Sequence, residues 1–552
     1  MIQSVHKMRG ADVLIDALKL AGVGKIFALS GNHIMPVYDA ALGRGIQLIH
    51  VRHEGAAVHM AESWARLTGE VGIALVTGGP GHANAIGALC TALASETPVI
   101  LLSGHAPLDE LGQGAFQEFP QATIAAPVCK ASWTAPSAAG LGKDLARAFR
   151  LARSGRPGPV HISLPFDLLE QVLAEGDLQA SPAALDYLSA PMKLPSATAG
   201  RVVAEVHQAQ RPLLIAAPGL CTTPGRALAT QLQAALGAPV IGMESPRGIN
   251  DPSLGAFAEI LAQADLIVLL GKPLDFTLRF GDAPVVAASC NWIVIDPDPA
   301  LIERAARGRG GRLVLSALAD ASHAVLALTA AARNHAEPAR HAGWLSEVQA
   351  AISYRPAQWQ GAMSHADAPM HAVEMCRALQ PVLDRHGDAV FVSDGGEVGQ
   401  WAQACLRAPH RVINGVCGAI GPALPFALAA QAAYPDSPVI AVSGDGAFGF
   451  HMAEFDTAVR ENLPLIVVVG NDARWNAEYQ IQLRAYGEAR AHGCTLRPAT
   501  RYDLVAVALG AHGEFVTRID ELPAAIERAI ASGKPACINV LIDGSPAPVV
   551  RR

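Results

Sequence analysis

The chain alternates short apolar strands with helical patterns along most of its length, and this alternation constrains the fold more than any other feature. The candidate strands are GKIFALS, IQLIHV, VGIALVT and PVILLSG in the first third, PLLIAAPG, APVIGM, ADLIVLLG and NWIVIDPDP in the second, and AVFVSDGGE, PVIAVSGDG, LPLIVVVGND and PACINVLID in the last. They are rich in β-branched residues and bounded by glycine, proline or polar residues, as in strands of a parallel sheet that is covered on both faces. The sequence therefore predicts an α/β fold built from three doubly wound parallel-sheet domains.

Two polar stretches, at residues 171–200 and 334–367, interrupt the alternation and are expected to connect the three sheets. A chain of 552 residues is also too long for a single hydrophobic core. The predicted domains are residues 1–175, 195–335 and 360–552. Ligands of such sheets bind at the carboxyl ends of the strands, where the Gly-rich and acidic turns of this chain occur.

The composition predicts a cytoplasmic protein that acts on small molecules. Hydrophobic residues make up 51% and charged residues 16%, and the net charge of −7 argues against nucleic acid or an anionic membrane as a partner. The nine cysteines form no CxxC pair, as is usual for reduced cytosolic thiols. No apolar run approaches the roughly 20 residues that cross a bilayer. Asp12 and Asp16 interrupt the amphipathic N-terminal pattern, which therefore does not read as a signal peptide.

Two candidate strands in the last third end on carboxylates. Asp445 lies between Gly444 and Gly446 in VIAVSGDGAFG, and Asp472 follows Asn471 at the end of PLIVVVGND. Because adjacent parallel strands end at the same edge of a sheet, the two anions are expected to be neighbours and to repel each other unless a cation lies between them. Mg²⁺ prefers oxygen ligands and often bridges carboxylates to phosphate. A lone GDG can be an ordinary tight turn, so the pair of turns is the stronger signal.

The spacing of these turns resembles the diphosphate-binding motif of the acetolactate synthase-like family of thiamine-diphosphate (ThDP) enzymes. In that motif a Gly-Asp-Gly turn is followed, after the next strand, by two asparagines. This chain has Asp472 where the second asparagine is usual, which adds negative charge beside a diphosphate. The resemblance implies Mg²⁺ ligands from Asp445, Asp472 or Asn471, and the backbone carbonyl of Arg474. It also places Gly444, Gly446, Ala447 and Trp475 beside the cofactor.

The first domain carries a second stretch that is similar to this family, VRHEGAAVHMAESWARLTGEVGIALVTGGPGHANA. The family's pyrimidine-binding segment has a glutamate in an Arg-His-Glu turn, which corresponds to Glu54. The resemblance implies that Glu54 hydrogen-bonds N1′ of the cofactor's aminopyrimidine, with Pro80 and Asn84 close by. Ala56 and Ala57 next to it suit a dry setting, which raises the pKa of a carboxyl group. The plainer interpretation of Glu54 is an exposed glutamate at a helix start.

The stretches between these motifs also follow the family's order, so the resemblance covers essentially the whole chain as pyrimidine-binding, central and diphosphate-binding domains. It implies that NGVCGAIGPALP supplies Gly418, for the amino group of the pyrimidine, and Ile420, which would hold the cofactor bent. It also implies that Gly395, Gly396 and Glu397 in SDGGEVGQW lie near the diphosphate. In this family the cofactor lies between two subunits, so a homodimer or homotetramer is expected.

Within the family, the closest resemblance is to benzaldehyde lyase. FALSGNHIMPVYDAAL places His33 two residues after Gly31, which is expected near the cofactor, and Gln113 matches a glutamine of that enzyme. The resemblance implies that His33 and Gln113 pass protons to and from the substrate, as positioned acid–base groups do. A lone histidine is otherwise more often structural.

The expected function is that of a ThDP- and Mg²⁺-dependent C–C lyase or carboligase acting on 2-hydroxy ketones, aldehydes or 2-oxo acids. GAFQEFPQ and PLDFTLRFG resemble 2-hydroxyacyl-CoA lyases and acetolactate synthases as much as they resemble benzaldehyde lyase. A 2-hydroxyacyl-CoA lyase or an oxalyl-CoA-type decarboxylase is therefore the alternative, and a non-catalytic subunit with a ThDP fold is the second alternative. Whether the central domain holds FAD, ADP or neither stays open.

Overall fold

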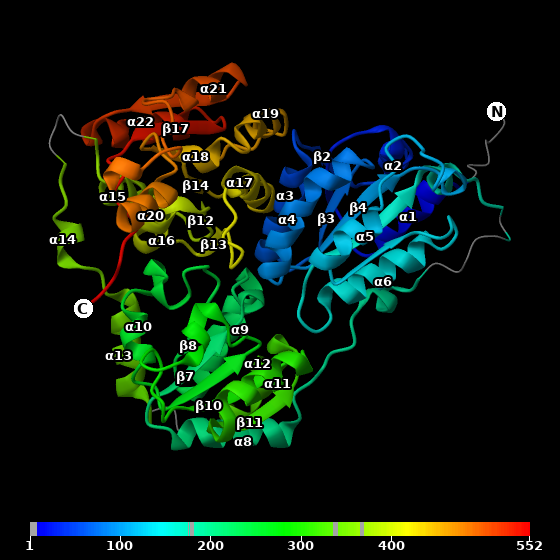
Figure 1. The fold of residues 1–552 in the computed structure, drawn as a ribbon. Helices are drawn as coiled ribbons and strands as arrows, with labels where there is room; N and C mark the ends of the chain where they lie inside the picture. Colours follow the sequence, from blue (N-terminus) through cyan, green and yellow to red (C-terminus); the bar gives the residue numbers. More distant parts are fainter. Residues whose placement is uncertain (1–7, 175, 177–181, 335–339, 365–368) are drawn as a thin grey trace. The chain divides into compact units, whose positions relative to one another are not determined.

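The computed structural model describes residues 8–174, 176, 182–334, 340–364 and 369–552. The chain folds into two compact units, Met1–Ala190 and Pro191–Arg552. Three parallel sheets, one in the first unit and two in the second, carry the architecture (Figure 1). The predicted α/β class with three doubly wound parallel sheets is confirmed.

The first unit is built on a six-stranded sheet. Its strands are β1 (Lys25–Ala28), β2 (Gln47–His50), β3 (Gly72–Val76), β4 (Val99–His105), β5 (Ala131–Thr134) and β6 (Val160–Pro165). They lie in the order β2-β1-β3-β4-β6-β5, and all the pairs are parallel. The chain passes from β1 to β2 on one side and then crosses to β3 on the other side of β1, so the strand order reverses at β1. Ligands of such sheets bind at the carboxyl ends of the strands next to such a reversal.

Seven helices accompany this sheet. They are α1 (Gly10–Leu20), α2 (Met35–Ala41), α3 (Glu54–Thr68), α4 (Pro80–Ala94), α5 (Gln121–Ala125), α6 (Leu141–Arg153) and α7 (Phe166–Glu170). α1 and α6 share one apolar cluster with the sheet, whereas α3 and α4 pack on each other and on β3. Helix α3 approaches β3 so closely that a Cβ atom added at Gly72 would lie 1.9 Å from the Ala61 carbonyl oxygen. A glycine at this position is therefore what allows the contact.

The second unit begins with a five-stranded sheet. Its strands are β7 (Pro212–Ala216), β8 (Val240–Gly242), β9 (Leu266–Leu270), β10 (Asn291–Asp296) and β11 (Leu313–Leu318), in the order β11-β10-β9-β7-β8. The helices around it are α8 (Ser196–Gln208), α9 (Thr223–Leu236), α10 (Phe257–Leu261), α11 (Pro299–Arg309), α12 (Ala321–Asn334), α13 (Ala342–Ser353) and α14 (Ala357–Gln360). Successive strand residues alternate between two clusters, one under α8, α9 and α12 and one under α10 and α13.

The second sheet of this unit has six strands, and it carries the acidic turns. Its strands are β12 (Val390–Ser393), β13 (His410–Ile413), β14 (Val439–Gly444), β15 (Ile466–Asn471), β16 (His512–Val516) and β17 (Ala536–Leu541), in the order β13-β12-β14-β15-β17-β16. Its helices are α15 (Ala372–Asp384), α16 (Gly396–Cys405), α17 (Ala423–Ala433), α18 (Asp445–Phe448), α19 (Phe455–Arg460), α20 (Asn476–Tyr486), α21 (Tyr502–Ala508) and α22 (Leu522–Ala531).

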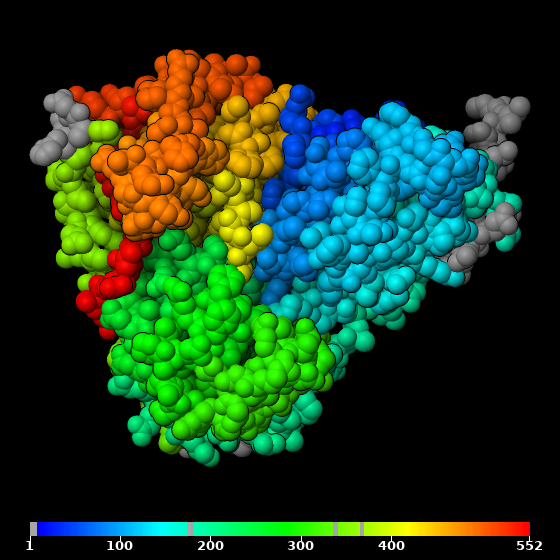
Figure 2. Space-filling model, viewed as in Figure 1, coloured from blue at the N-terminus to red at the C-terminus, as the bar shows by residue number. Residues whose placement is uncertain are grey.

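The C-terminal residues link the two sheets of the second unit. In Figure 2 this segment, in red, reaches the green surface of the five-stranded sheet's domain. The backbone N–H of Arg552 donates to the Glu259 carboxylate over 2.9 Å, and the Trp401 indole N–H donates to the Pro546 carbonyl over 3.0 Å. Among the described helices, none combines the length and the apolar run that crossing a bilayer requires.

Each predicted strand is present, but five further strands were not predicted: β5, β6, β11, β13 and β16. The polar stretch at residues 334–367 was expected to be a plain connection, and this was wrong for residues 342–353. They form α13, whose Trp344, Val348 and Ala351 are buried against the five-stranded sheet's cluster. Residues 175, 177–181, 335–339 and 365–368 of the two predicted connections lie outside the described residues.

The contact between α3 and β3 gives the first prediction. G72A puts a methyl group onto the Ala61 carbonyl, so the unfolding free energy should fall by about 1–3 kcal/mol, as overpacking typically costs. The melting temperature of the variant, measured by circular dichroism, checks this. G24A is the matched control, since Gly24 is exposed before β1 and an added Cβ meets nothing within 4 Å. Equal melting temperatures of the two variants would contradict the prediction.

Candidate active site

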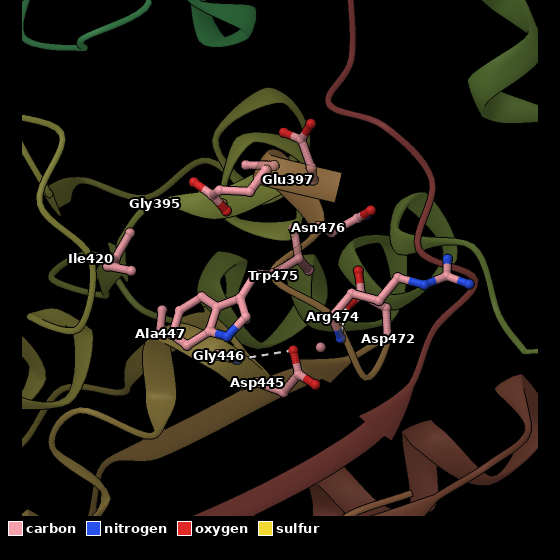
Figure 3. Close-up of a pocket in the computed structure, with 16 residues that line it drawn as sticks. Gly395, Glu397, Ile420, Asp445, Gly446, Ala447, Asp472, Arg474, Trp475 and Asn476 are labelled. Carbon is pink, nitrogen blue, oxygen red and sulfur yellow. Dashed lines mark hydrogen bonds between the residues drawn. The ribbon is translucent and has the colours of Figure 1, made fainter. Parts of the chain in front are cut away.

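A pocket lies at the carboxyl end of the six-stranded sheet of the second unit (Figure 3). The residues that line it come from the ends of β12, β14 and β15, the starts of α16, α18 and α20, and the loop before α17. They are Gly395, Gly396, Glu397, Val398, Ile420, Gly444, Asp445, Gly446, Ala447, Gly470, Asp472, Arg474, Trp475, Asn476, Ala477 and Glu478. The structure thus gathers most of the residues that the sequence predicted for the diphosphate half of the site.

Asp445 and Asp472 face each other in this pocket because β14 and β15 are in register. Gly444 pairs with Gly470, so strands β14 and β15 end side by side at the same edge of the sheet. One oxygen of Asp445, Oδ1, accepts the Gly446 N–H over 2.9 Å, and Oδ2 has no hydrogen-bond partner among the described residues. Asp445 is only 2% exposed, so this oxygen is buried without compensation, which costs free energy. A cation at Oδ2 would remove that cost.

The pKa values of the two carboxyls reflect this environment. Burial, together with the neighbouring charge of Asp472, raises the pKa of Asp445 to about 7. Burial also raises the pKa of Asp472 to about 6, opposed by the Arg474 N–H, which donates to Oδ1 over 3.1 Å, and by the charge of that arginine. Two carboxyls that resist ionisation next to each other form a site that a divalent cation would stabilise.

Asn471 was predicted as an alternative metal ligand, and the geometry favours Asp472 over it. The Asn471 amide is buried and donates to the Thr500 carbonyl and to Asn539 Oδ1, each over 3.1 Å. Its own oxygen accepts the Ala473 N–H over 3.3 Å. Asn471 therefore holds the end of β15 to β17 and to the loop at Thr500, and it does not line the pocket.

Residues 473–475 form the loop after β15, and a second segment fixes them. Arg474 and Thr495 form an isolated antiparallel β-bridge. The backbone N–H of Trp475 donates to the Cys494 carbonyl over 2.8 Å. The Trp475 indole then lies over Gly446, where an added Cβ would be 2.7 Å from the ring, and meets the Phe450 ring edge-on at 6.2 Å. Figure 3 shows this indole extending between Asp445 and Ile420.

The opposite wall is formed by the start of α16 and the loop before α17. A Cβ added at Gly395 would lie 2.7 Å from Ile420 Cγ2, so this glycine allows the loop to approach. Glu397 Oε2 accepts a hydrogen bond from Arg247 Nη2 over 3.1 Å. Gly418, at φ +70°, lies outside the pocket lining, and a Cβ added there would be 3.4 Å from Pro246 Cβ.

In the first unit, Glu54 begins α3 and is buried. Its Oε2 accepts the amide N–H of Asn84 over 3.0 Å. Pro80 begins α4, and a Cβ added at Gly81 would lie 3.3 Å from Glu54 Oε1. The structure therefore brings Glu54, Pro80 and Asn84 together, as predicted. Glu54 is not the exposed helix-start glutamate of the plainer interpretation.

His33 belongs to the same cluster through Thr77. Its Nδ1 lies 3.3 Å from Thr77 Oγ1, and burial lowers the pKa of the imidazole. Gly31 also touches Thr77, since an added Cβ would lie 2.4 Å from the Thr77 Cβ. The neutral form of His33 is thus favoured, which suits a group that accepts and returns a proton.

Gln113 is not brought to this cluster. Its side chain is exposed, and its amide donates to the Asp109 carbonyl over 2.6 Å. Gln117 lies closer, because an added Cβ at Gly79 would be 2.7 Å from the Gln117 carbonyl oxygen. Gln121 was missed altogether: it is fully buried and accepts the Gly79 N–H over 2.7 Å. Both glutamines belong to the segment GAFQEFPQ, and the sequence pattern does not indicate which of the two side chains is buried.

Comparisons with known proteins agree with this geometry. The thiamine pyrophosphate enzyme N-terminal TPP binding domain matches residues 8–124, and the C-terminal TPP binding domain matches residues 394–540. The acetolactate synthase large subunit IlvG of Mycobacterium tuberculosis is 32% identical over 99% of this chain and 97% of its own length. The chain belongs to the thiamine pyrophosphate enzyme family. The predicted family and the prediction of a ThDP-dependent enzyme are confirmed.

Other relatives of this thiamine pyrophosphate enzyme fall into two groups by name. The acetolactate synthase isozyme 2 large subunit of Escherichia coli is 29% identical over 97% of the chain and 96% of its own length. Human 2-hydroxyacyl-CoA lyase 2 is 29% identical over 98% of the chain and 92% of its own length. The enzyme is therefore of the acetolactate synthase and 2-hydroxyacyl-CoA lyase type. The resemblance to benzaldehyde lyase stays a prediction.

The carboxylate pair gives a prediction on pH. Because an unfolded Asp titrates near 4, the folded protein binds more protons than the unfolded chain between about pH 4 and pH 7. Stability contributed by the pair should therefore fall as the pH rises through this window. In EDTA, the melting temperature of the wild type should drop more between pH 5 and pH 8 than that of D445N. Parallel curves for the two proteins would contradict the prediction.

Proposed function

We propose that the enzyme is a ThDP- and Mg²⁺-dependent lyase or carboligase that breaks or forms a C–C bond next to a carbonyl. Its substrates would be 2-hydroxy ketones, aldehydes or 2-oxo acids. The observation that carries this proposal is the pair of neighbouring carboxylates Asp445, which is buried, and Asp472, which is half-buried, with Asp445 Oδ2 left without a partner among the described residues. Similarity over nearly the whole chain to acetolactate synthases supports the reaction class.

The pocket residues suit a metal ion and a diphosphate. We assign Mg²⁺ to Asp445, Asp472 and the backbone carbonyl of Arg474, because Mg²⁺ prefers oxygen ligands and keeps substrate phosphates in its shell. The turns at Gly395 and Gly446 would receive the diphosphate, since backbone without a side chain lets phosphate approach the N–H groups. Ile420 and Trp475, which face the same space, would hold the rings of the cofactor.

When bound, ThDP supplies the electron sink for the reaction at the C–C bond. The chain's own residues orient groups and move protons. Asn84 holds Oε2 of Glu54, which leaves Oε1 to carry and release the proton of the carboxyl group. Thr77 lies next to Nδ1 of His33, which leaves Nε2 of its neutral ring for a substrate hydroxyl. Burial of both groups excludes water from these proton transfers.

We further propose that the active form is a homodimer, or a homotetramer built from such dimers. Each chain would contribute its Glu54 cluster to the carboxylate pocket of the other chain. The support for this is the resemblance to the family, in which the cofactor lies between subunits.

A 2-hydroxyacyl-CoA lyase is the second candidate, favoured by the similarity to the human enzyme of that name. The charge of the carboxylate pocket favours substrates without phosphate groups. A CoA thioester carries several phosphate groups, which basic side chains attract. Of the described residues that line the pocket, Arg474 is the single basic one. Free 2-oxo acids, acyloins and aldehydes are therefore the first choice.

The substrate class is tested by a product assay. With ThDP and Mg²⁺ present, wild-type turnover of the best 2-oxo acid or acyloin in a small panel should exceed that of 2-hydroxyacyl-CoA and oxalyl-CoA thioesters by about tenfold, or ~1.4 kcal/mol of transition-state binding. Products are measured by chromatography. Faster cleavage of a CoA thioester would reverse the order of the two candidates.

The role of Glu54 is tested by E54Q. The amide keeps the shape of the side chain and can still meet Asn84, but it cannot carry the proton, so turnover should fall by about 10²–10⁴-fold, the usual value of a positioned acid–base group. The melting temperature should stay within a few degrees of the wild type. E303Q on α11, where Glu303 is 71% exposed, is the matched control. Unchanged turnover in E54Q would refute the mechanism.

A further inference from the structure

The pocket at the ends of β14 and β15 is unusually acidic for a diphosphate site. Of the described residues that line it, four carry carboxylates, and these are Glu397, Asp445, Asp472 and Glu478. Glu397 is paired with Arg247, and Glu478 is exposed on the first turn of α20. Asp445, which is buried, and Asp472, which is half-buried, remain as two neighbouring carboxylates without a basic partner within salt-bridge distance among the described residues.

The two positive charges of a divalent cation are cancelled by these two carboxylates, so the ion and its ligands together carry no net positive charge. With one carboxylate and one amide among its ligands, the same ion would keep a net charge of +1 toward a diphosphate. With two carboxylates the ion and its ligands are neutral, so attraction of the phosphoryl groups must come from elsewhere. In a buried site this difference is weakly screened by salt.

Arg474 is placed where it could supply that charge. Its guanidinium carbon lies 4.6 Å from the centre of the Tyr479 ring, so the head group is held by a cation–π contact. A Cβ added at Gly544 would be 3.2 Å from Arg474 Nη1 and 3.5 Å from Asp472 Oδ2. The two side chains therefore reach the same turn. In Figure 3 the guanidinium points away from Ile420, so it would act on the pocket through its charge and not by contact.

The turn at Gly544 is itself fixed. Gly544 has φ +66°, and its carbonyl accepts the amide N–H of Asn476 over 2.8 Å. Asn476 begins α20, directly after Trp475 and two residues after Arg474. The guanidinium is thus confined between Tyr479 on α20 and a turn bonded to the same helix, and it stays near Asp472 without forming a salt bridge with it within 4.0 Å.

We propose that Arg474 is a positioning residue for the diphosphate, whose guanidinium restores the positive charge that Asp472 removes from the metal site. The inference rests on the proposed ThDP and Mg²⁺ site. It adds the source of the positive charge that a site with two carboxylate ligands needs in order to attract a diphosphate. Asp472 and Arg474 then act as a matched pair, and a change in one alters the effect of a change in the other.

The experiment is a double-mutant cycle read by calorimetry, with no assay of turnover. ThDP is titrated into the cofactor-free, full-length protein at saturating Mg²⁺, for the wild type, R474Q, D472N and D472N/R474Q. R474Q should weaken ThDP binding by about tenfold when Asp472 is present and by less than about twofold in the D472N background, since the effects of neighbouring charges are not additive. Circular dichroism checks the fold of each variant.

Two further variants separate charge from structure. R474K keeps the positive charge and should stay within about threefold of the wild type in ThDP affinity, although lysine lacks the planar head group. R484Q removes a charge in the last turn of α20, outside the pocket lining, and should leave the affinity unchanged. If R474K loses as much affinity as R474Q, the charge is not the cause and the proposal is wrong.

The remaining outcomes are also decisive. An equal loss on R474Q in both backgrounds would mean that Arg474 acts on the diphosphate independently of Asp472, which overturns the matched pair. No loss in either background would overturn any role of Arg474. Absence of binding heat in the wild type itself would reject the proposed function, whereas normal wild-type binding with an additive cycle rejects this inference alone.

Discussion

The repulsion between two neighbouring carboxylates, one buried and one half-buried, is the constraint on which the proposed site depends. The in-register pairing of Gly444 with Gly470 delivers Asp445 and Asp472 to one spot, where burial and their proximity raise both pKa values. Such an arrangement persists only if the surrounding backbone holds it. The Asn471 amide fastens β15 to its neighbour, and residues 473–475 are bonded to a second segment. These bonds hold the two strand ends in the positions that the proposed cation would require.

The strands that could be predicted are those whose apolar runs are continuous. β7, β9, β14 and β15 are buried along their length, and such runs are recognisable without knowledge of their partners. The edge strands β5, β11, β13 and β16 are half-buried and mix polar residues into every run. β6 was missed for another reason. Its buried His161 bonds to Ser103 and Ser132 on neighbouring strands, and such long-range pairing cannot be seen in one segment.

Site residues could be predicted where the turn that carries them is recognisable in the sequence. They could be predicted less well where the direction of the side chain determines whether a residue enters the pocket. Asp445 follows directly from its glycine-flanked turn. Asn471 and Asp472 are adjacent, but consecutive side chains at a strand end point to opposite sides, so one fastens the sheet and the other enters the pocket. Gln113 was predicted from a short resemblance, and the fold of its loop leaves it exposed beside Asp109. The pairing of Glu397 with Arg247 joins residues 150 positions apart, which no local pattern reveals.

The two halves of the proposed site are each complete within their own unit, and this explains how so acidic a pocket can serve an anionic cofactor. Asn84 orients Glu54 whether or not the other half is present. The carboxylate pair is likewise set by sheet register alone. Because hydrogen bonds within each half already fix its geometry, the ordering cost of binding would be low, and more of the binding free energy would remain to hold an anion against the carboxylates. Preorganisation and the guanidinium of Arg474 would then act together, one by lowering the entropic cost and the other by balancing charge.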